Sequence, residues 1–387
     1  MKINQKLNEL VKKVRGFTRI YADYHKRCQT AGSWLFVWFV VNLFFVSVPY
    51  LAAQTNHLVS FSNPAHLWGN GTERFIEEAY RQFFTTRIID GKVMNIRLPF
   101  AMNNDRDLNI PERINIIGDG KGSPGLLIPI IQNILDSEEF AEYINALSSG
   151  REKVIIFDIP QRSWSISTDR FLIGQIKSGA FKGLPHRPHV LHSGRGAMES
   201  DVNNYLFCIG NVGVDCSGFV WFILNYVGAR RGINLGEILS PVLGVPEGGN
   251  PAMYAGTAFF NSINPQVIAV NDEIRNLRPA DIMLLRSIEG EVVHSAVIQS
   301  IDFTRGIIRY LQCNNVAQLE KRGVHESFIY FDPANPAVSL KDPSLHWTNK
   351  RSAPFSGEEI NFTDDGDRYR HRLNGGGRVV RLRALAN

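Results

Sequence analysis

The sequence has little of several features that would place it in a special class of protein. It contains four cysteines in 387 residues, too few for a disulfide scaffold. No internal repeat and no collagen-like glycine period occurs in it. Charged residues make up 20% of the chain and hydrophobic residues 44%. This balance argues against disorder across the chain and is ample for one sizeable core or two domains of ordinary size.

Basic residues are concentrated at the N-terminus. Residues 1–33 hold eight lysines and arginines but two acidic residues, so this segment carries a net +6. The whole chain carries +5, which leaves a net charge of −1 for everything that follows. Because nucleic-acid binding needs a basic face, we expect no nucleic-acid partner.

A long uncharged run follows the basic segment. Residues 34–53, WLFVWFVVNLFFVSVPYLAA, contain no charged side chain, and a run of this length spans a bilayer as a helix. We predict a single-pass membrane anchor, with residues 1–33 in the cytoplasm and the chain after residue 54 in the periplasm or outside the cell. The alternative is a cleaved signal peptide and a secreted protein. Leu51 argues against cleavage after Ala53 because it spoils the small-x-small pattern.

Residues 54–185 are predicted to form a small α/β region of unknown role. A helix is expected in TERFIEEAYRQFF, and RINII, LLIPIIQNILDSEEFAEYINAL and KVIIFDI then follow a strand, helix, strand pattern. Gly120, Gly122 and Gly125 match the spacing of a dinucleotide-binding turn. The nearest suitable carboxylate, Asp158, follows 33 residues later rather than about twenty. We therefore predict a tight glycine turn and no cofactor.

Three histidines lie three residues apart in PHRPHVLH. On a helix, His186, His189 and His192 would share one face, as in a zinc site. Pro185 and Pro188 disfavour a helix, and no cysteine or carboxylate lies close by to complete a ligand set. We expect an extended linker into residues 190–387 and no metal.

A possible nucleophile follows the linker. DCSGFVWFILNYVGARRG predicts a helix that begins at Cys216 and ends near Gly228, with Asp215 and Ser217 as typical N-cap and first-turn residues. A thiol at a helix N-terminus lies at the positive end of the dipole, which favours the thiolate. The free backbone N–H groups there can hold an oxyanion. This pattern favours a nucleophilic over a structural cysteine.

A possible base and its orienting partner lie further along. RPADIMLLRSIEGEVVHSAVIQSI predicts two strands joined by a turn at Glu289 and Gly290, with His294 on the second strand. Gln312 follows 18 residues later, polar among apolar neighbours on the next predicted strand, GIIRYLQC. Gln312 can accept a hydrogen bond from the far ring nitrogen of His294 and so fix its tautomer, as the third member of a triad does.

The other exported cysteines suggest one further hypothesis. If the chain after residue 54 lies outside the cytoplasm, Cys208, Cys216 and Cys313 lie there too, an odd number. A disulfide between Cys208 and Cys313 would leave Cys216 as a free thiol.

These motifs resemble the NlpC-type papain-like cysteine peptidases of bacterial cell walls. The resemblance covers residues 190–387 and rests on DCSGF, then a strand opening with histidine, then a strand with a polar residue. YLFCIG is similar to the family's Y-x-W-G-G lead-in, and LRPAD to its L-x-P-G-D turn. GGRVVRLRAL resembles the strand that closes the family's small barrel.

The resemblance implies a fold class and a set of roles. The fold would be α+β and papain-like, with a helix-borne cysteine packed on a small antiparallel sheet or barrel. Cys216 would be the nucleophile, His294 the general base and acid, and Gln312 the orienting residue. The site would also use three residues in oxyanion and substrate binding: Tyr205 at the oxyanion, with Asp215 and Ser217 beside the subsite for the free amine of a short acyl-donor peptide.

The resemblance also implies a function. The protein would be a membrane-anchored hydrolase that cuts an amide bond in peptidoglycan stem peptides, typically between D-glutamate and a diamino acid, without metal or cofactor. The sequence departs from the family at Cys208 and Ala280, where glycine is usual, and by insertions near 229–270 and 334–377 that would line or cover the cleft. Two alternatives stay open. One is an inert module that binds wall peptides or a partner, and the other is an amidase or acyltransferase that uses the same triad.

Overall fold

The computed structural model describes most of the chain beyond residue 70. All of these residues belong to the unit Asn63–Asn387, and none of their helices is long and apolar enough to cross a bilayer. The predicted cytoplasmic segment, the predicted anchor at 34–53 and the strand predicted in RINII lie outside the described residues. The structure describes residues 71–100, 123–148, 150–159, 161–178, 189–210, 212–287, 290–314, 323–348, 373–374 and 376–386.

Helix α2 (Thr72–Arg81) opens the described part, as predicted, and leads into a hairpin. Its buried face includes Ile76 and Tyr80, one turn apart. Strands β1 (Phe84–Ile89) and β2 (Lys92–Arg97) pair antiparallel. Both residues between them have positive φ, 52° at Asp90 and 70° at Gly91. That conformation matches the twist of a hairpin, and Asp-Gly favours it.

The helix predicted in LLIPIIQNILDSEEFAEYINAL is in fact two helices, α4 (Pro124–Leu135) and α5 (Glu138–Ser148). The break falls at Ser137. Its hydroxyl donates to the carbonyl of Ile134 (2.7 Å) and accepts from the amide of Phe140 (3.2 Å). A serine that caps the next helix in this way ends one helix and starts another.

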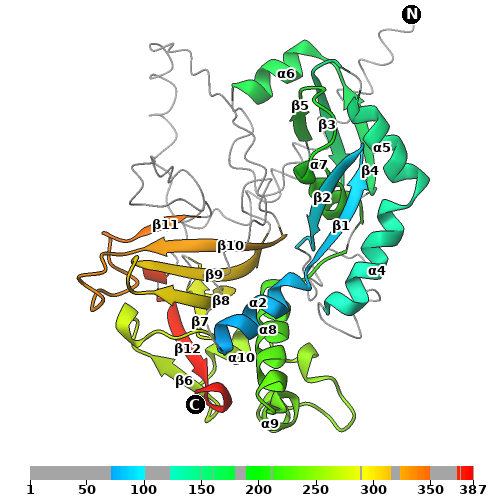
Figure 1. Cartoon of the computed structure of the whole chain (residues 1–387). Coiled ribbons are helices and arrows are strands. Elements are labelled where there is room, and N and C mark those ends of the chain that lie inside the picture. Colours follow the sequence, from blue (N-terminus) through cyan, green and yellow to red (C-terminus); the bar gives the residue numbers. More distant parts are fainter. Residues whose placement is uncertain are drawn as a thin grey trace, which may run out of the picture. The chain divides into compact units, whose positions relative to one another are not determined.

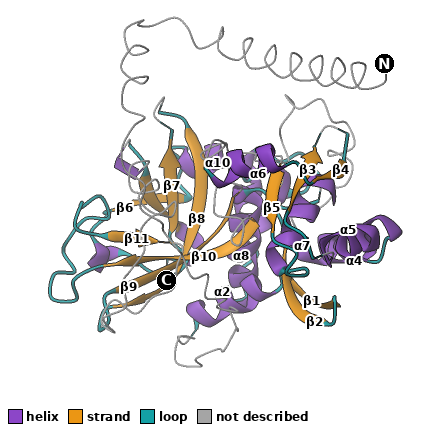
Figure 2. Cartoon of the chain, turned by 90° about the horizontal axis from the view of Figure 1, so that it is seen from above, coloured by secondary structure: helices purple, strands orange, loops and turns teal. Residues whose placement is uncertain are grey.

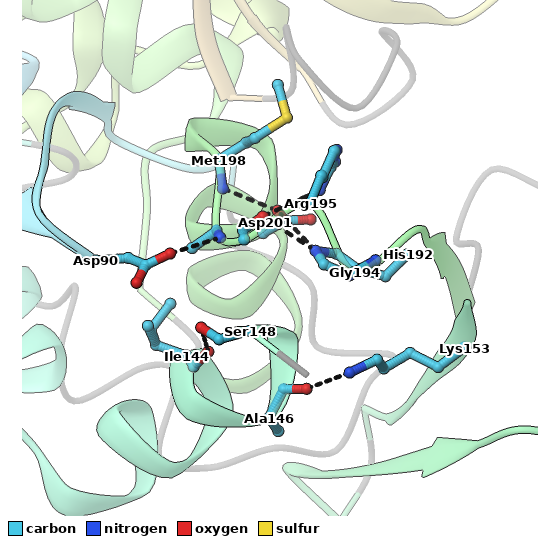
Figure 3. Close-up of polar contacts among 12 residues, drawn as sticks. Asp90, Ile144, Ala146, Ser148, Lys153, His192, Gly194, Arg195, Met198 and Asp201 are labelled. Carbon is cyan, nitrogen blue, oxygen red and sulfur yellow. Dashed lines mark hydrogen bonds and ion pairs between the residues drawn. The ribbon is translucent and has the colours of Figure 1, made fainter. Parts of the chain in front are cut away.

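A small antiparallel sheet follows, in the order β4-β3-β5. Strand β3 (Lys153–Asp158) was predicted; β5 (His189–His192) lies in the stretch predicted to be a linker. Residues 189–192 are extended, as expected, but they pair with β3 and so belong to the sheet. Lys153 is buried, and its Nζ donates to the carbonyl of Ala146 (2.5 Å) near the end of α5 (Figure 3). The remaining elements here are β4 (Ser163–Ser167) and α6 (Arg170–Lys177).

A seven-stranded antiparallel sheet carries the predicted base and its orienting partner (Figure 1). Its order is β11-β10-β9-β8-β7-β12-β6, so strand β12 of the C-terminus lies between β6 and β7. The described part is therefore α+β with antiparallel sheets. Each predicted insertion contributes one edge strand: β6 comes from 229–270 and β11 from 334–377. The strands are β6 (Val267–Val270), β7 (Ile282–Arg286), β8 (Val292–Asp302), β9 (Ile307–Asn314), β10 (Gly323–Tyr330), β11 (His346–Thr348) and β12 (Arg378–Leu382).

Helix α8 (Cys216–Arg230) packs against β8 and β9 on one face of this sheet and against α2, and α10 lies beside β7 and β8 (Figure 2). Apolar side chains from α2, α8 and the sheet form one core, which includes Ile76, Phe219 and Leu311. The other face of the sheet has a second core around Tyr310. The other helical elements are α7 (Glu199–Tyr205), the π-turn η3 (Leu206–Gly210), α9 (Leu235–Leu243), α10 (Thr257–Asn261) and the 3-10 turns at Pro251–Met253, Ile274–Asn276 and Arg383–Leu385.

The core does not divide between residues 185 and 190, where a domain boundary was predicted. Helix α2 lies before that point and the sheet after it, yet they share a core. They also share a buried ion-pair network. Arg309 on β9 pairs with Glu77 of α2 (2.6 Å) and with Glu326 of β10 (2.7 Å). The helix that begins the described part is therefore integral to the half of the chain that carries Cys216.

Candidate active site

Cys216 is the first residue of α8, as predicted. The carboxylate of Asp215 accepts a hydrogen bond from the amide of Gly218 and another from the hydroxyl of Ser217 (3.3 Å). These bonds cap the helix and explain why it begins at the cysteine. They also occupy the Asp215 side chain, which is 7% exposed.

The segment that leads to Cys216 is held close to the end of β2. The amide of Val214 donates to the carbonyl of Pro99 (3.0 Å), and Val214 bridges to Phe100. A Cβ on Gly213 would lie 2.3 Å from that same carbonyl oxygen. Only glycine allows the two segments to approach so closely, and this approach fixes where the helix begins.

The thiol of Cys216 contacts strand β8 at Ser295. Burial, and then the negative charge of Asp215, raise the pKa of the thiol to about 11, although hydrogen bonds from Ser295 and from the Ser217 amide act in the opposite direction. The buried hydroxyl of Ser295 makes no other hydrogen bond within the described ranges. The expected resting thiolate is therefore not supported, because desolvation and a like charge outweigh the helix terminus.

His294 and Gln312 form the predicted hydrogen bond. The ring nitrogen Nε2 of His294 lies 2.8 Å from Oε1 of Gln312, and both side chains are buried. A carboxamide oxygen has no hydrogen to donate, so Nε2 must carry the proton of this bond. The neutral ring then has Nδ1 as its acceptor.

The Cys216 thiol contacts β8 at Ser295, the residue that follows His294. The His294 ring leaves the strand in a different direction. Ser295 pairs with Leu284, which belongs to the core on the α8 side, whereas His294 pairs with Leu285, which belongs to the core on the other face. Side chains alternate along a strand, so the imidazole leaves β8 on the face that holds Gln312. The sulfur meets the backbone amide of Ser295, which lies in the plane of the sheet.

The structure places Tyr205 in a different group of residues. Its ring packs against Phe140 (5.1 Å between centroids) and Tyr143 (4.8 Å). Burial and the charge of Glu139, to which its hydroxyl is hydrogen-bonded, raise the pKa of the phenol. The π-turn at Leu206–Gly210 follows it directly. The oxyanion role predicted for Tyr205 therefore finds no support in its surroundings.

The hypothesis of a disulfide between Cys208 and Cys313 is wrong. Both are buried free thiols, as Cys216 is free. The thiol of Cys313 instead donates to the carbonyl of Val214 (3.1 Å). Burial raises its pKa well above the ordinary value, and the nearby Cys216 and Asp215 raise it further.

The turn before β7 holds Ala280, at the position where the LRPAD resemblance has glycine, in a backbone conformation that glycine adopts more readily. Ala280 has a φ of 74°, in the left-handed region that favours glycine. Asp281 is fully buried there and accepts from the amide of Arg278 (2.8 Å) and from Arg381 of β12 (2.6 and 2.8 Å). Burial raises the pKa of this carboxyl, and Arg381 partly offsets the effect.

Two polar residues near Gln312 were not predicted. The side chain of Asn314 donates to Oε1 of Gln312 (3.2 Å), and Nε2 of Gln312 donates to the hydroxyl of Ser327 on β10 (2.7 Å). The signal in the sequence was weak, since each strand also holds other polar residues and nothing in the sequence marks these two. Asn314 lies on β9 itself, two residues after Gln312, whereas the contact of Ser327 depends on the pairing of β9 with β10.

The buried histidine of β5 has a structural role. Nδ1 of His192 accepts from the amide of Gly194 (3.0 Å), and Nε2 lies 3.2 Å from the carbonyl of Gly196 (Figure 3). Beside it, Asp201 accepts from the amide of Met198 (2.9 Å). These bonds hold the loop before α7. Among the residues that the structure describes, no cluster of histidine, cysteine and carboxylate side chains is suited to a metal ion.

Comparison of the chain with protein-family models, with curated proteins and with solved structures found no match in any of the three. The chemistry of the site therefore has to be argued from its geometry. That geometry comprises a thiol at a helix start, an imidazole on the strand it contacts, and a carboxamide bonded to the imidazole.

Proposed function

We propose that this chain is a cysteine hydrolase that cleaves an amide bond through an acyl-enzyme. Cys216 is the nucleophile, His294 the general base and acid, and Gln312 the orienting residue. The observation that carries the proposal is the 2.8 Å bond from His294 to Gln312, made on the strand that the Cys216 thiol contacts. That bond holds the ring in the tautomer whose Nδ1 can take a proton.

The raised pKa of Cys216 implies that proton transfer accompanies attack. A thiol with a pKa of about 11 is almost fully protonated at neutral pH. This step requires the His294 ring to reach the sulfur beside Ser295; there Nδ1 takes the thiol proton as the sulfur adds to the carbonyl carbon, and Gln312 stabilises the resulting imidazolium. The imidazolium then protonates the leaving amine, and a water molecule activated by His294 hydrolyses the thioester.

The start of α8 supplies the groups that an oxyanion needs. Asp215 occupies the amide of Gly218 and the sulfur occupies the amide of Ser217, so the amide of Cys216 is the one that we assign to the developing negative charge. The same N-terminus brings a carboxylate close to the thiol. A substrate ammonium beside Asp215 would offset the charge that raises the pKa of Cys216.

The proposed substrate is a peptidoglycan stem peptide, on the basis of the DCSGF motif and its resemblance to cell-wall peptidases. Asp215 and Ser217 would flank the subsite for the free amine of the acyl donor. We propose further that residues 34–53 anchor the chain, with the site outside the cytoplasm. This part of the proposal rests on the uncharged run and its basic flank alone.

A second candidate is an inert module that binds wall peptides without cutting them. The observation in its favour is the environment of Cys216, in which burial and a carboxylate oppose the thiolate. An inert module needs no proton transfer, so such an environment has no cost for it. The two candidates differ in one measurable respect: only the hydrolase converts the fragment that it binds.

Replacement of the sulfur tests the proposal. The full-length Cys216→Ala variant should release no product from defined wall fragments, measured by mass spectrometry, while its thermal melt stays close to that of the wild type. Cys208→Ala is the matched control, because it removes another free thiol, a buried one, and should leave cleavage intact. Product release by Cys216→Ala, or fragment binding by the wild type with no cleavage, would contradict the hydrolase.

A further inference from the structure

A network of buried polar side chains on β9 and β10 contacts the His294 imidazole through Gln312. We propose that Ser327 and Asn314 are positioning residues that lock the carboxamide of Gln312 in one orientation and thereby fix the tautomer of His294. The inference rests on the proposed function for its consequence in catalysis. The lock itself is a property of the fold and can be measured without activity.

The two ends of the Gln312 carboxamide have different partners. Its oxygen accepts from His294 (2.8 Å) and from Asn314 (3.2 Å), and its nitrogen donates to the hydroxyl of Ser327 (2.7 Å). Rotation of the carboxamide by 180° would turn its NH₂ group toward the Asn314 NH₂ group. Two donors would then face each other, and the Ser327 hydroxyl would have to donate to the Gln312 oxygen instead of accepting, so the clash with Asn314 is what favours the single orientation.

Because the network is buried, a change in the orientation of the Gln312 carboxamide costs free energy. Gln312 and Ser327 are fully buried and Asn314 is 4% exposed. Bulk water therefore cannot replace a lost partner, and a buried donor without an acceptor carries its full desolvation penalty. In a network of this kind, the loss of one member weakens the bonds that remain.

The orientation of Gln312 controls which nitrogen of His294 is protonated. When the oxygen faces Nε2, that nitrogen carries the proton and Nδ1 can accept one from the thiol. When the NH₂ group faces Nε2, the nitrogen must act as an acceptor, and the proton moves to Nδ1. The second tautomer cannot take the proton of Cys216, so a flipped carboxamide disables the proposed base.

Ser327→Ala removes the acceptor for the Gln312 nitrogen and is the primary variant. We expect His294, labelled with ¹⁵N in the full-length protein, to change from one tautomer with protonated Nε2 to a mixture with a resolved Nδ1–H population. Its signals are assigned by their loss in His294→Gln. Turnover of wall fragments should fall roughly tenfold, with little change in KM, because the reactive tautomer is diluted while the substrate subsite is untouched.

Three further variants separate the lock from general damage. Ser327→Thr keeps the hydroxyl and should restore the wild-type tautomer. Asn314→Ala removes the second donor and should shift the tautomer in the same direction as Ser327→Ala, which keeps the test available if that variant folds poorly. Ser200→Ala is the matched control, since Ser200 is also a buried serine, on α7, and should leave the tautomer unchanged.

The two readouts distinguish failure of the lock from failure of the hydrolase. A single Nε2–H tautomer in folded Ser327→Ala and Asn314→Ala would overturn the lock, whatever the activity. A shifted tautomer in a protein whose wild type cleaves nothing would support the lock and overturn the hydrolase. A shifted tautomer with undiminished turnover would overturn the role of the lock in catalysis.

Discussion

The protonation state of Cys216 gives the sharpest test of the site, through its rate of alkylation. At pH 8, a thiol with a pKa of about 11 is roughly 0.1% ionised, whereas one at the ordinary value of 9.0 is roughly 10% ionised. Because the thiolate is the reacting form, iodoacetamide should modify Cys216 about a hundredfold more slowly than an exposed cysteine. The rate should keep rising up to pH 10 and beyond.

Asp215→Asn changes the charge near the sulfur while keeping the helix cap. Asparagine is as good an N-cap as aspartate, so α8 should still begin at Cys216. Loss of the negative charge lowers the pKa of the thiol, because Asp215 is the second cause of its rise after burial. Alkylation at pH 8 should become roughly tenfold faster.

The same burial links the thiol to stability at high pH. Between pH 9 and about 11 the unfolded thiol loses its proton while the folded thiol keeps it, so the free energy of unfolding falls as the pH rises. The wild type should lose about 2 kcal/mol across this range relative to Cys216→Ala. Urea denaturation of both proteins at pH 8 and pH 11 measures the difference.

The alkylation rate of Cys216 is measured by mass spectrometry of its peptide after timed reaction with iodoacetamide from pH 6 to pH 10.5. The buried Cys313 serves as an internal reference. Fast modification with a midpoint below pH 8, unaffected by Asp215→Asn, would refute the reasoning. It would show that His294 already holds the proton of the thiol in the resting protein.

Two further predictions concern the framework that positions the site. Arg309→Met leaves the buried Glu77 and the largely enclosed Glu326 without their shared cation, so the free energy of unfolding in urea should fall by about 3–5 kcal/mol. Arg305→Met, at an exposed pair with Asp302, is the control, and equal losses in both variants would contradict the role of burial. Gly213→Ala places a Cβ 2.3 Å from the Pro99 carbonyl, which should cost roughly 1–3 kcal/mol and reduce cleavage. Its control is Gly174→Ala, where nothing lies within 4 Å; an unfolding midpoint unchanged in both variants would show that the close approach is dispensable.

The elements that the sequence predicted well are those that depend on neighbouring residues. Asp215 caps α8 through the amide of Gly218, three residues away, and that signal is visible in the motif itself. The turn after β7 and the strand that carries His294 follow from the apolar run and Gly290. The bond from His294 to Gln312 needed only the antiparallel pairing of consecutive strands, a short-range expectation.

The predictions that failed depended on tertiary surroundings. Burial is the main cause of the raised pKa of Cys216, and the thiol is buried against a strand whose contacting residue, Ser295, lies 79 residues further along the chain. The direction of the Tyr205 side chain follows from its packing on α5, where Phe140 and Tyr143 receive it. Neither contact has a local signature. The break at Ser137 had one, but its polar residues also fit the exposed face of a longer helix.

The ion-pair network around Arg309 has a practical consequence for dividing this chain into fragments. A fragment that starts at residue 190 would contain every residue of the proposed triad, and sequence boundaries alone would recommend it. It would lack α2, and with it the apolar cover of α8 and one of the two counter-ions of a buried guanidinium. Expression work should therefore start upstream of Thr72, because the segment that looks like a separate domain is part of the scaffold of the site.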